Sequence, residues 1–208
     1  MHIIINIGMP ETVSSASIPV ENHPLEPFLP ANGRLLMLGS FPPPRKRWCM
    51  DFYYPNFTND MWRVFGLVFF GDAQRLVDAE CKTYRLAEIK ALLNEKGIGL
   101  YDTACAVRRL QDNAADKFLE VVTPTDIEAL LGKMPCCRAI ATTGQKATET
   151  LCAHFGVEVP KVGGYVKFMQ HGEEFRLYRM PSTSRAYPLA LAKKAEAYGK
   201  MLAEVMGE

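Results

Sequence analysis

The sequence predicts a three-layer α/β/α domain built on a central, mainly parallel four-stranded sheet. Two observations carry this prediction. Short apolar runs typical of buried strands alternate with amphipathic helical patterns, and this strand–loop–helix order recurs four times. The chain is also long enough, at 208 residues of which 48% are hydrophobic, to bury one sizeable core without disulfides.

The first 32 residues are predicted to form a proline-rich arm, and residues 33–208 a single α/β domain. Five prolines lie in this first segment: Pro10, Pro19, Pro24, Pro27 and Pro30. Because proline lacks an amide hydrogen and resists both helix and central strand, we expect the arm to be extended or looped.

The first half of the domain contains two predicted strands and two predicted helices. The run Leu35–Leu38 ends at Gly39-Ser40, as expected of a buried parallel strand. An apolar segment over 98–107 provides a second strand that ends near Asp102. Helical spacing of apolar residues predicts helices over 59–70 and 86–95, and a loop rich in proline and aromatic residues joins the first strand to the first helix.

The second half continues the alternation. Thr123–Asp126 supplies a helix cap and an early proline before a helix over 127–131. Further elements are predicted from apolar pattern: strands over 138–144, 165–169 and 175–180, and helices over 145–155 and 188–206. The strand over 165–169 is expected to be an edge partner that turns at His171-Gly172.

Composition and charge exclude several classes of protein. The 24 basic and 23 acidic residues give a net charge of +1, which excludes a uniformly basic nucleic-acid coat but permits a local basic patch. The six cysteines form no C-x-x-C pair, so we expect no disulfide framework, no metal site and no cofactor. We find no signal-peptide pattern and no apolar run long enough for a membrane span, and we expect a cytoplasmic monomer.

Polar and glycine-containing segments follow four predicted strands. They are Gly39–Pro42, Tyr101–Thr103, Thr142–Gly144 and Met180–Ser184. In open parallel sheets the functional crevice lies beyond the carboxyl ends of the strands. Each segment alone is more often structural, but four at successive strand ends predict a site at that edge.

These segments, in this order and spacing, resemble the uracil-DNA glycosylase superfamily, and most closely its DNA-deoxyinosine (hypoxanthine-DNA) glycosylase branch. The resemblance rests on Leu36–Pro42, Phe52–Tyr54, Asn59–Trp62, Gly97–Asp102, Ala141–Ala147 and Met180–Ser184. It covers about His23 to Leu202. It implies a uracil-DNA glycosylase-like fold, damaged DNA as the partner, and hydrolysis of the N-glycosidic bond of a flipped hypoxanthine or uracil.

The resemblance and the chemistry together assign candidate roles. Bond cleavage places positive charge on the sugar and negative charge on the leaving base, so a carboxylate and hydrogen-bond donors are needed. The candidate catalytic residues are Asp102, Ser40 and Asp51, with Asp102 the best-placed carboxylate and a turn or helix cap its structural alternative. The candidate base pocket comprises Gly39, Phe41, Pro42, Phe52, Tyr53, Tyr54, Asn59, Thr143 and Gly144.

The candidate contacts to the DNA backbone are basic and hydroxyl-bearing residues near the first and last strand ends. They are Arg45, Lys46, Arg47, Pro181, Ser182, Thr183, Ser184 and Arg185. Two further basic pairs, Arg108-Arg109 and Lys193-Lys194, are weaker candidates, and for every cluster the alternative is an ordinary solvated surface. None of the four strand-end segments contains a lysine, so Schiff-base lyase chemistry is not expected.

Two positions depart from the superfamily pattern and leave the substrate open. Phe41 occupies a place where several branches have a polar Asn or Asp, and Thr143 stands where a base-reading Asn often lies. A threonine hydroxyl still makes one hydrogen bond. The alternative functions are a non-catalytic nucleic-acid-binding relative and a hydrolase of free nucleosides.

Overall fold

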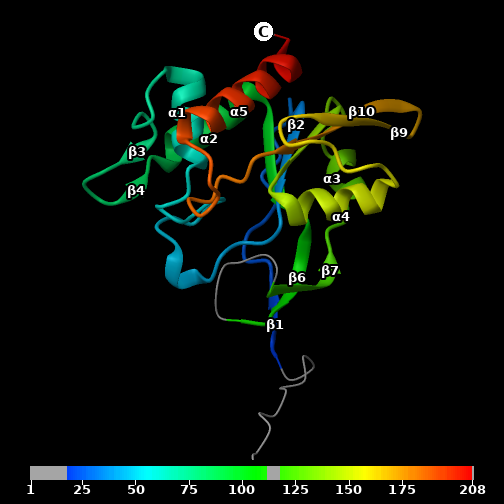
Figure 1. Ribbon diagram of the computed structural model, residues 1–208, viewed down its shortest axis with the longest axis horizontal. Helices are drawn as coiled ribbons and strands as arrows, with labels where there is room; N and C mark the ends of the chain where they lie inside the picture. The colour runs from blue at the N-terminus through cyan, green and yellow to red at the C-terminus, as the bar shows by residue number, and fades with distance from the viewer. Residues whose placement is uncertain (1–17, 112–117, 208) are drawn as a thin grey trace, which may run out of the picture.

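A five-stranded sheet with four parallel strands forms the centre of the fold (Figure 1). The computed structural model describes residues 18–111 and 118–207, so residues 1–17 of the predicted arm lie outside the described residues. The strand order is β5 (Ile98–Asp102), β2 (Leu35–Gly39), β8 (Ala139–Thr143), β10 (Glu173–Met180) and β9 (Tyr165–Gln170). The predicted mainly parallel sheet is confirmed, but it has five strands rather than four.

The fifth strand, β9, pairs antiparallel with β10 at one edge of the sheet. The two strands turn at His171-Gly172, as predicted, and both turn residues have positive φ angles of 49° and 81°. Two consecutive positive φ angles are the geometry that favours a tight two-residue hairpin. Adding β9 extends the sheet without changing the order of the parallel strands.

Strands β2 and β5 are buried because helices cover both faces of the sheet. Every residue of β2 and β5 is buried, as expected where neither face meets water. In Figure 1, α1 (Met61–Phe70), α2 (Leu86–Lys96) and α5 (Leu191–Met206) lie on one side, and α3 (Ile127–Gly132) and α4 (Gln145–Phe155) on the other. The helix α1 begins two residues later than predicted, at Met61, whose amide donates a hydrogen bond to the Asn59 side chain at 2.9 Å in a turn that precedes the helix.

A second, antiparallel sheet lies below the carboxyl end of β5 (Figure 1). It contains β1 (Val20–Asn22), β6 (Ala104–Arg109) and β7 (Leu119–Pro124), in the order β1-β6-β7. The chain leaves β5 at Asp102 and enters β6 after a single residue, whose amide donates to the Gly39 carbonyl at 2.8 Å. Sequence reasoning did not predict this sheet, and it assigned 123–124 to a helix entrance rather than to the end of β7.

The described part of the predicted arm packs on the domain. Strand β1 pairs with β6, and Phe28 forms an antiparallel bridge with Leu100 in β5. A small hairpin, β3 (Val77–Asp78) with β4 (Thr83–Tyr84), precedes α2. Within the described residues, no helix is both long and apolar enough to cross a membrane.

Candidate functional site

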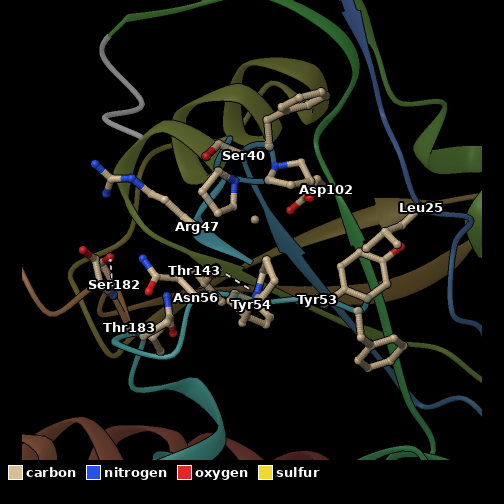
Figure 2. A pocket seen from close by; sticks show the side chains of 18 residues that line it. Leu25, Ser40, Arg47, Tyr53, Tyr54, Asn56, Asp102, Thr143, Ser182 and Thr183 are labelled. Atoms are coloured by element: carbon tan, nitrogen blue, oxygen red, sulfur yellow. Dashed lines mark hydrogen bonds between the residues drawn. The ribbon is translucent and has the colours of Figure 1, made fainter. Parts of the chain in front are cut away.

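The strand order brings the ends of the four parallel strands together in one row. Neighbouring strands lie about 4.8 Å apart, so β5, β2, β8 and β10 present Asp102, Gly39, Thr143 and the Ser182 loop in that order. A cleft of about 290 Å³ opens at this edge (Figure 2). It is lined by Leu25, Gly39, Ser40, Phe41, Pro42, Pro43, Arg47, Phe52, Tyr53, Tyr54, Pro55, Asn56, Asn59, Asp102, Thr143, Ser182, Thr183 and Ser184.

Asp102 places a buried carboxylate at one wall of the cleft. Its side chain is only 10% exposed, and Oδ2 lies 2.9 Å from Nε2 of His23. The backbone carbonyl of Asp102 also accepts a hydrogen bond from the Thr125 hydroxyl at 2.7 Å. These contacts fix both the backbone and the side chain of Asp102.

Gly39 leaves the space that the Asp102 carboxylate occupies. The two residues are register partners in the parallel pair of β2 and β5. A Cβ atom built on Gly39 would lie 2.4 Å from Asp102 Oδ1 and 3.7 Å from Thr143 Oγ1. A contact of 2.4 Å is far inside van der Waals distance, so only glycine at this position permits the observed carboxylate position.

The aromatic run after the first strand splits between core and cleft. Phe52 and Tyr53 border the cleft but are largely buried; Phe52 stacks on Trp62, and the Tyr53 hydroxyl donates to the Glu26 carbonyl at 2.8 Å. Tyr54 is only half-buried and has a positive φ of 51°. This conformation is uncommon for a residue with a side chain, and it directs Tyr54 toward the cleft (Figure 2).

Tyr54 and Thr143 form a polar contact on the floor of the cleft. Their hydroxyl oxygens are 3.1 Å apart. Burial raises the pKa of the Tyr54 hydroxyl well above its usual value, and the negative charge of Asp102 raises it further. Tyr54 therefore remains a neutral phenol that pairs a flat aromatic face with a hydrogen-bonding group.

The segment Ser40–Pro42 lines the cleft on the side opposite Tyr54 and Thr143. Ser40 is half-buried and, like Asp102, lines the cleft (Figure 2). The Phe41 ring meets the His23 ring edge to face at 5.4 Å and packs on a small core of Ala104, Val107 and Leu119. The Pro42 carbonyl accepts a hydrogen bond from the buried Arg109 guanidinium at 3.1 Å.

The loop after β10 closes the far end of the cleft with hydroxyl groups. Ser182, Thr183 and Ser184 all line the cleft. The Lys194 ammonium donates to the Ser184 carbonyl at 2.9 Å and to Asp60 Oδ2 at 2.8 Å. The Asp60 amide in turn donates to the Thr183 carbonyl at 2.8 Å. The loop is thus held from α5 and from the start of α1.

The basic residues predicted to contact DNA have different surroundings. Arg47 lines the cleft, and Arg185, which follows the cleft residue Ser184, has a side chain that is 66% exposed. Arg45 pairs with Asp51 at 2.6 Å on the exposed surface. Among the weaker candidates, Arg109 and Lys194 are buried in ion pairs with Glu21 and Asp60, so neither presents its charge to solvent.

Several predicted site residues do not line the cleft. They are Asp51, Gly144, Arg45, Lys46, Pro181 and Arg185. The exposed Asp51 carboxylate faces Arg45 instead, which leaves Asp102 as the predicted catalytic carboxylate that borders the cleft. Gly144 begins α4 with a φ of 115°, a conformation that favours glycine, and the Pro181 carbonyl is buried against the Tyr198 hydroxyl.

Sequence reasoning missed two polar residues at the site, His23 and Asn56. Asn56 lines the cleft, and its Oδ1 accepts from the amide and the hydroxyl of Thr58 at 3.0 and 2.9 Å. With Oδ1 fixed in this way, the amide nitrogen is the end of the side chain that points away from Thr58. Figure 2 shows Asn56, Thr143 and Ser182 on the same side of the cleft.

The signal for Asn56 was available in the sequence, because Asn56 lies two residues after the aromatic run Phe52–Tyr54. No comparable local signal marks His23, whose partner Asp102 lies 79 positions away. Across the described residues, no group of three or more histidine, cysteine, aspartate or glutamate side chains is arranged to hold a metal ion.

Comparison with known proteins identifies the fold. No family model and no curated protein sequence matches this chain. Among solved structures, it is similar to a protein from Methanosarcina acetivorans, determined in solution by NMR and described as a candidate uracil-DNA glycosylase. The similarity covers 90% of this chain and 99% of that chain, with a TM-score of 0.58 and 22% sequence identity. The chain therefore has the fold of that protein, in agreement with the uracil-DNA glycosylase-like architecture expected from its sequence.

Proposed function

We propose that this chain is a DNA-repair glycosylase that hydrolyses the N-glycosidic bond of a flipped, deaminated base, hypoxanthine or uracil. The observation that carries the proposal is the cleft itself. A buried carboxylate, an aromatic face and a row of hydroxyls converge at the carboxyl ends of the parallel strands. Its volume of about 290 Å³ is at the small end of ligand clefts, ~300 Å³, which suits one flipped nucleotide.

In this proposal Tyr54 stacks on the flipped base. Base–aromatic stacking contributes about 1–3 kcal/mol per base, and Tyr54 is the least buried aromatic of the run Phe52–Tyr54. The Thr143 hydroxyl, which already contacts Tyr54, meets the edge of the same base. Thr143 also stands where the uracil-DNA glycosylase superfamily often has a base-reading Asn, and this resemblance supports a base in this position.

The side-chain amide of Asn56 explains how the cleft would select deaminated bases over undamaged ones. Deamination replaces an amino group, a donor on adenine and cytosine, by a carbonyl oxygen, an acceptor. The Asn56 N–H can donate a hydrogen bond to that carbonyl. Opposite the amino group of an undamaged base, it would face another donor, and no hydrogen bond would form. Both hypoxanthine and uracil carry the new carbonyl, so this group favours the deaminated class over its parent bases.

The reaction is hydrolysis, with Asp102 as the carboxylate beside the sugar. A water molecule adds to C1′ as the bond from C1′ to the base nitrogen breaks, and the bond electrons leave with the base. Asp102 stabilises the positive charge on the sugar and accepts the proton of the attacking water. Ser40 and its neighbouring backbone groups orient that water, while Ser182, Thr183 and Ser184, with Arg47 and Arg185, contact the phosphates.

We further propose that the enzyme is monofunctional. A lyase step needs an amine that attacks the sugar carbon. Among the described residues that line the cleft there is no lysine. The nearby Lys194 is held by Asp60 and the Ser184 carbonyl.

The test is excision from labelled duplexes that each carry one hypoxanthine, uracil, xanthine, adenine or cytosine at a fixed position. After incubation, hot alkali converts every abasic site into a strand break. We expect breaks at hypoxanthine or uracil only after alkali, and none at adenine or cytosine. Salt-sensitive binding without breaks would indicate a non-catalytic DNA-binding protein, and release of hypoxanthine from free deoxyinosine alone would indicate a nucleoside hydrolase.

The Asp102→Asn variant separates catalysis from folding. Asparagine keeps the shape of the side chain but removes its charge and its basicity, so we expect excision to fall by about 10²- to 10⁴-fold while duplex binding persists. The Asp51→Asn variant tests the alternative carboxylate. A larger loss for Asp51→Asn than for Asp102→Asn would transfer the catalytic role to Asp51.

A further inference from the structure

His23 holds the proposed catalytic carboxylate from behind the cleft. Its side chain is only 2% exposed, and its Nε2 lies 2.9 Å from Asp102 Oδ2. The other oxygen, Oδ1, is the one that sits against Gly39, which lines the cleft. One carboxylate oxygen therefore faces a histidine and the other faces the side on which substrate would bind.

The two nitrogens of the His23 ring have complementary partners. Nδ1 lies 2.9 Å from the Leu25 carbonyl oxygen and 3.2 Å from the Leu25 amide nitrogen. A neutral ring accepts from the Leu25 amide at Nδ1, and a protonated ring donates to the Leu25 carbonyl from the same atom. An ionised Asp102 carboxylate only accepts hydrogen bonds, so with Asp102 ionised Nε2 carries the hydrogen and donates it to Oδ2 whether the ring is neutral or protonated.

Aromatic rings fix the orientation of the His23 ring. The Tyr101 ring centroid lies 4.5 Å away, the Phe41 centroid 5.4 Å and the Tyr53 centroid 6.3 Å. Phe41 and Tyr53 also border the cleft. The ring thus cannot swing away from Asp102 without disturbing cleft residues.

The backbone around His23 is anchored on both sides. Upstream, β1 pairs with β6, and the His23 amide donates to the Cys105 carbonyl at 2.7 Å. Downstream, Phe28 and Leu100 exchange backbone hydrogen bonds of 3.0 and 2.8 Å. The segment 20–28 is therefore part of the domain structure, and it places the His23 side chain against Asp102.

We propose that His23 is the positioning residue for Asp102, and that the segment 20–28 completes the active site by supplying it. This inference rests on the proposed function, because it assigns His23 a role through the carboxylate of that reaction. His23 does not line the cleft, so it acts on Asp102 and not on the substrate. Removing it frees the carboxylate to rotate and leaves Oδ2 without its buried donor.

The experiment compares two variants of the full-length chain by single-turnover excision from the duplex that the wild type cleaves. His23→Met fills the space among the three rings with a flexible side chain that packs well on aromatics, but it donates no hydrogen bond. His23→Gln places an amide N–H near the position of Nε2. We expect His23→Met to lower the single-turnover rate constant roughly 10- to 100-fold, a loss of the size found for hydrogen-bond partners that orient metal ligands, and His23→Gln to restore most of it.

Two measurements separate positioning from a purely structural role. Affinity for a duplex with an abasic site should be unchanged in His23→Met, because His23 touches no DNA. In an Asp102→Asn background, His23→Met should cause little further loss of excision, because the group on which it acts is already disabled. The matched control is His154→Met on helix α4, which makes the same chemical change as His23→Met away from the cleft and should leave excision unchanged.

Each outcome decides the proposal. Equal losses from His23→Met in the wild-type and Asp102→Asn backgrounds would show that His23 acts through folding alone, as would failure of His23→Gln to restore the single-turnover rate. If His23→Met does not fold, His23→Leu replaces it in the same comparison. Excision by the wild type together with a normal single-turnover rate in the folded variants would overturn this inference alone, whereas no excision by the wild type on any duplex would overturn the proposed function as well.

Discussion

At the scale of single residues, the position of the Asp102 carboxylate depends on Gly39, which has no Cβ atom. Gly39 and Asp102 are neighbours across two parallel strands, and the carboxylate lies where a Cβ on Gly39 would be. The same carboxylate is held at its other oxygen by His23. It therefore cannot move away from position 39 without loss of that hydrogen bond.

This arrangement predicts the effect of Gly39→Ala. The new methyl group would lie 2.4 Å from Asp102 Oδ1 and must displace it. A misplacement of about 1 Å in a reacting group costs about 100-fold in rate, so we expect a loss of that size in single-turnover excision, with a cooperative thermal transition retained.

The matched control is Gly199→Ala in helix α5. There the added methyl group meets only Val68 side-chain atoms at 3.7 and 3.9 Å, which is ordinary packing distance. Excision by Gly199→Ala should equal that of the wild type. Wild-type excision by Gly39→Ala would contradict the assigned position of the Asp102 carboxylate.

At the scale of elements, a buried ion pair joins α5 and the start of α1 to the loop that closes the cleft. Lys194 on α5 is 1% exposed and pairs with Asp60 at the start of α1, while it also bonds the Ser184 carbonyl in the closing loop. Loss of Lys194 leaves the buried Asp60 carboxylate with the exposed Arg185 guanidinium, 3.9 Å away, as its remaining ion-pair partner. That loss typically costs about 3–5 kcal/mol.

We therefore expect Lys194→Met to lower the free energy of unfolding by about 3–5 kcal/mol, measured by urea titration. Lys193→Met, on the adjacent and exposed position of the same helix, should change it little, because Lys193 pairs with Glu196 in solvent. Adding Asp60→Asn to Lys194→Met should recover part of the loss. Equal stability of the two lysine variants would contradict the role of the buried pair.

The elements that sequence reasoning predicted are those with a local signal. Strands β2 and β5 were predictable because both faces are buried, which demands an unbroken apolar run. Strands β1 and β7 were not predictable. The last three residues of β7 are exposed, and the short strand β1 lies in a proline-rich segment. Their pairing with β6 is a long-range contact that no local pattern encodes.

The same distinction applies to the candidate site. Asp102, Thr143 and the Ser182 loop were predictable because strand ends in a parallel sheet share one edge. His23 was not predictable, because its importance comes from a hydrogen bond to a residue 79 positions away. Nor did basic composition distinguish Arg47 at the cleft from Arg109 in an internal ion pair, because burial is a property of the folded chain.

At the scale of the whole molecule, a net charge of +1 leaves DNA affinity to the distribution of charge rather than to its total. Two buried cations, Arg109 and Lys194, are matched by carboxylates and contribute little to the external field. Arg47 lies at the cleft, and the exposed Arg185 follows the closing loop. The electrostatic part of DNA binding should therefore come from a few residues at one edge.

The salt dependence of DNA binding tests this distribution. Each phosphate neutralised by a basic side chain adds about 0.9 to the negative slope of log affinity against log salt concentration. We expect Arg47→Gln to reduce that slope by about 1, measured by fluorescence anisotropy on a duplex with an abasic site. Lys167→Gln removes the same charge from β9, where Lys167 pairs with Glu174 on the exposed edge of the sheet, and should leave the slope unchanged. An equal reduction of the slope by both variants would indicate that DNA is attracted by charge spread over the whole surface. In that case Arg47 at the cleft would make no specific contact with a phosphate.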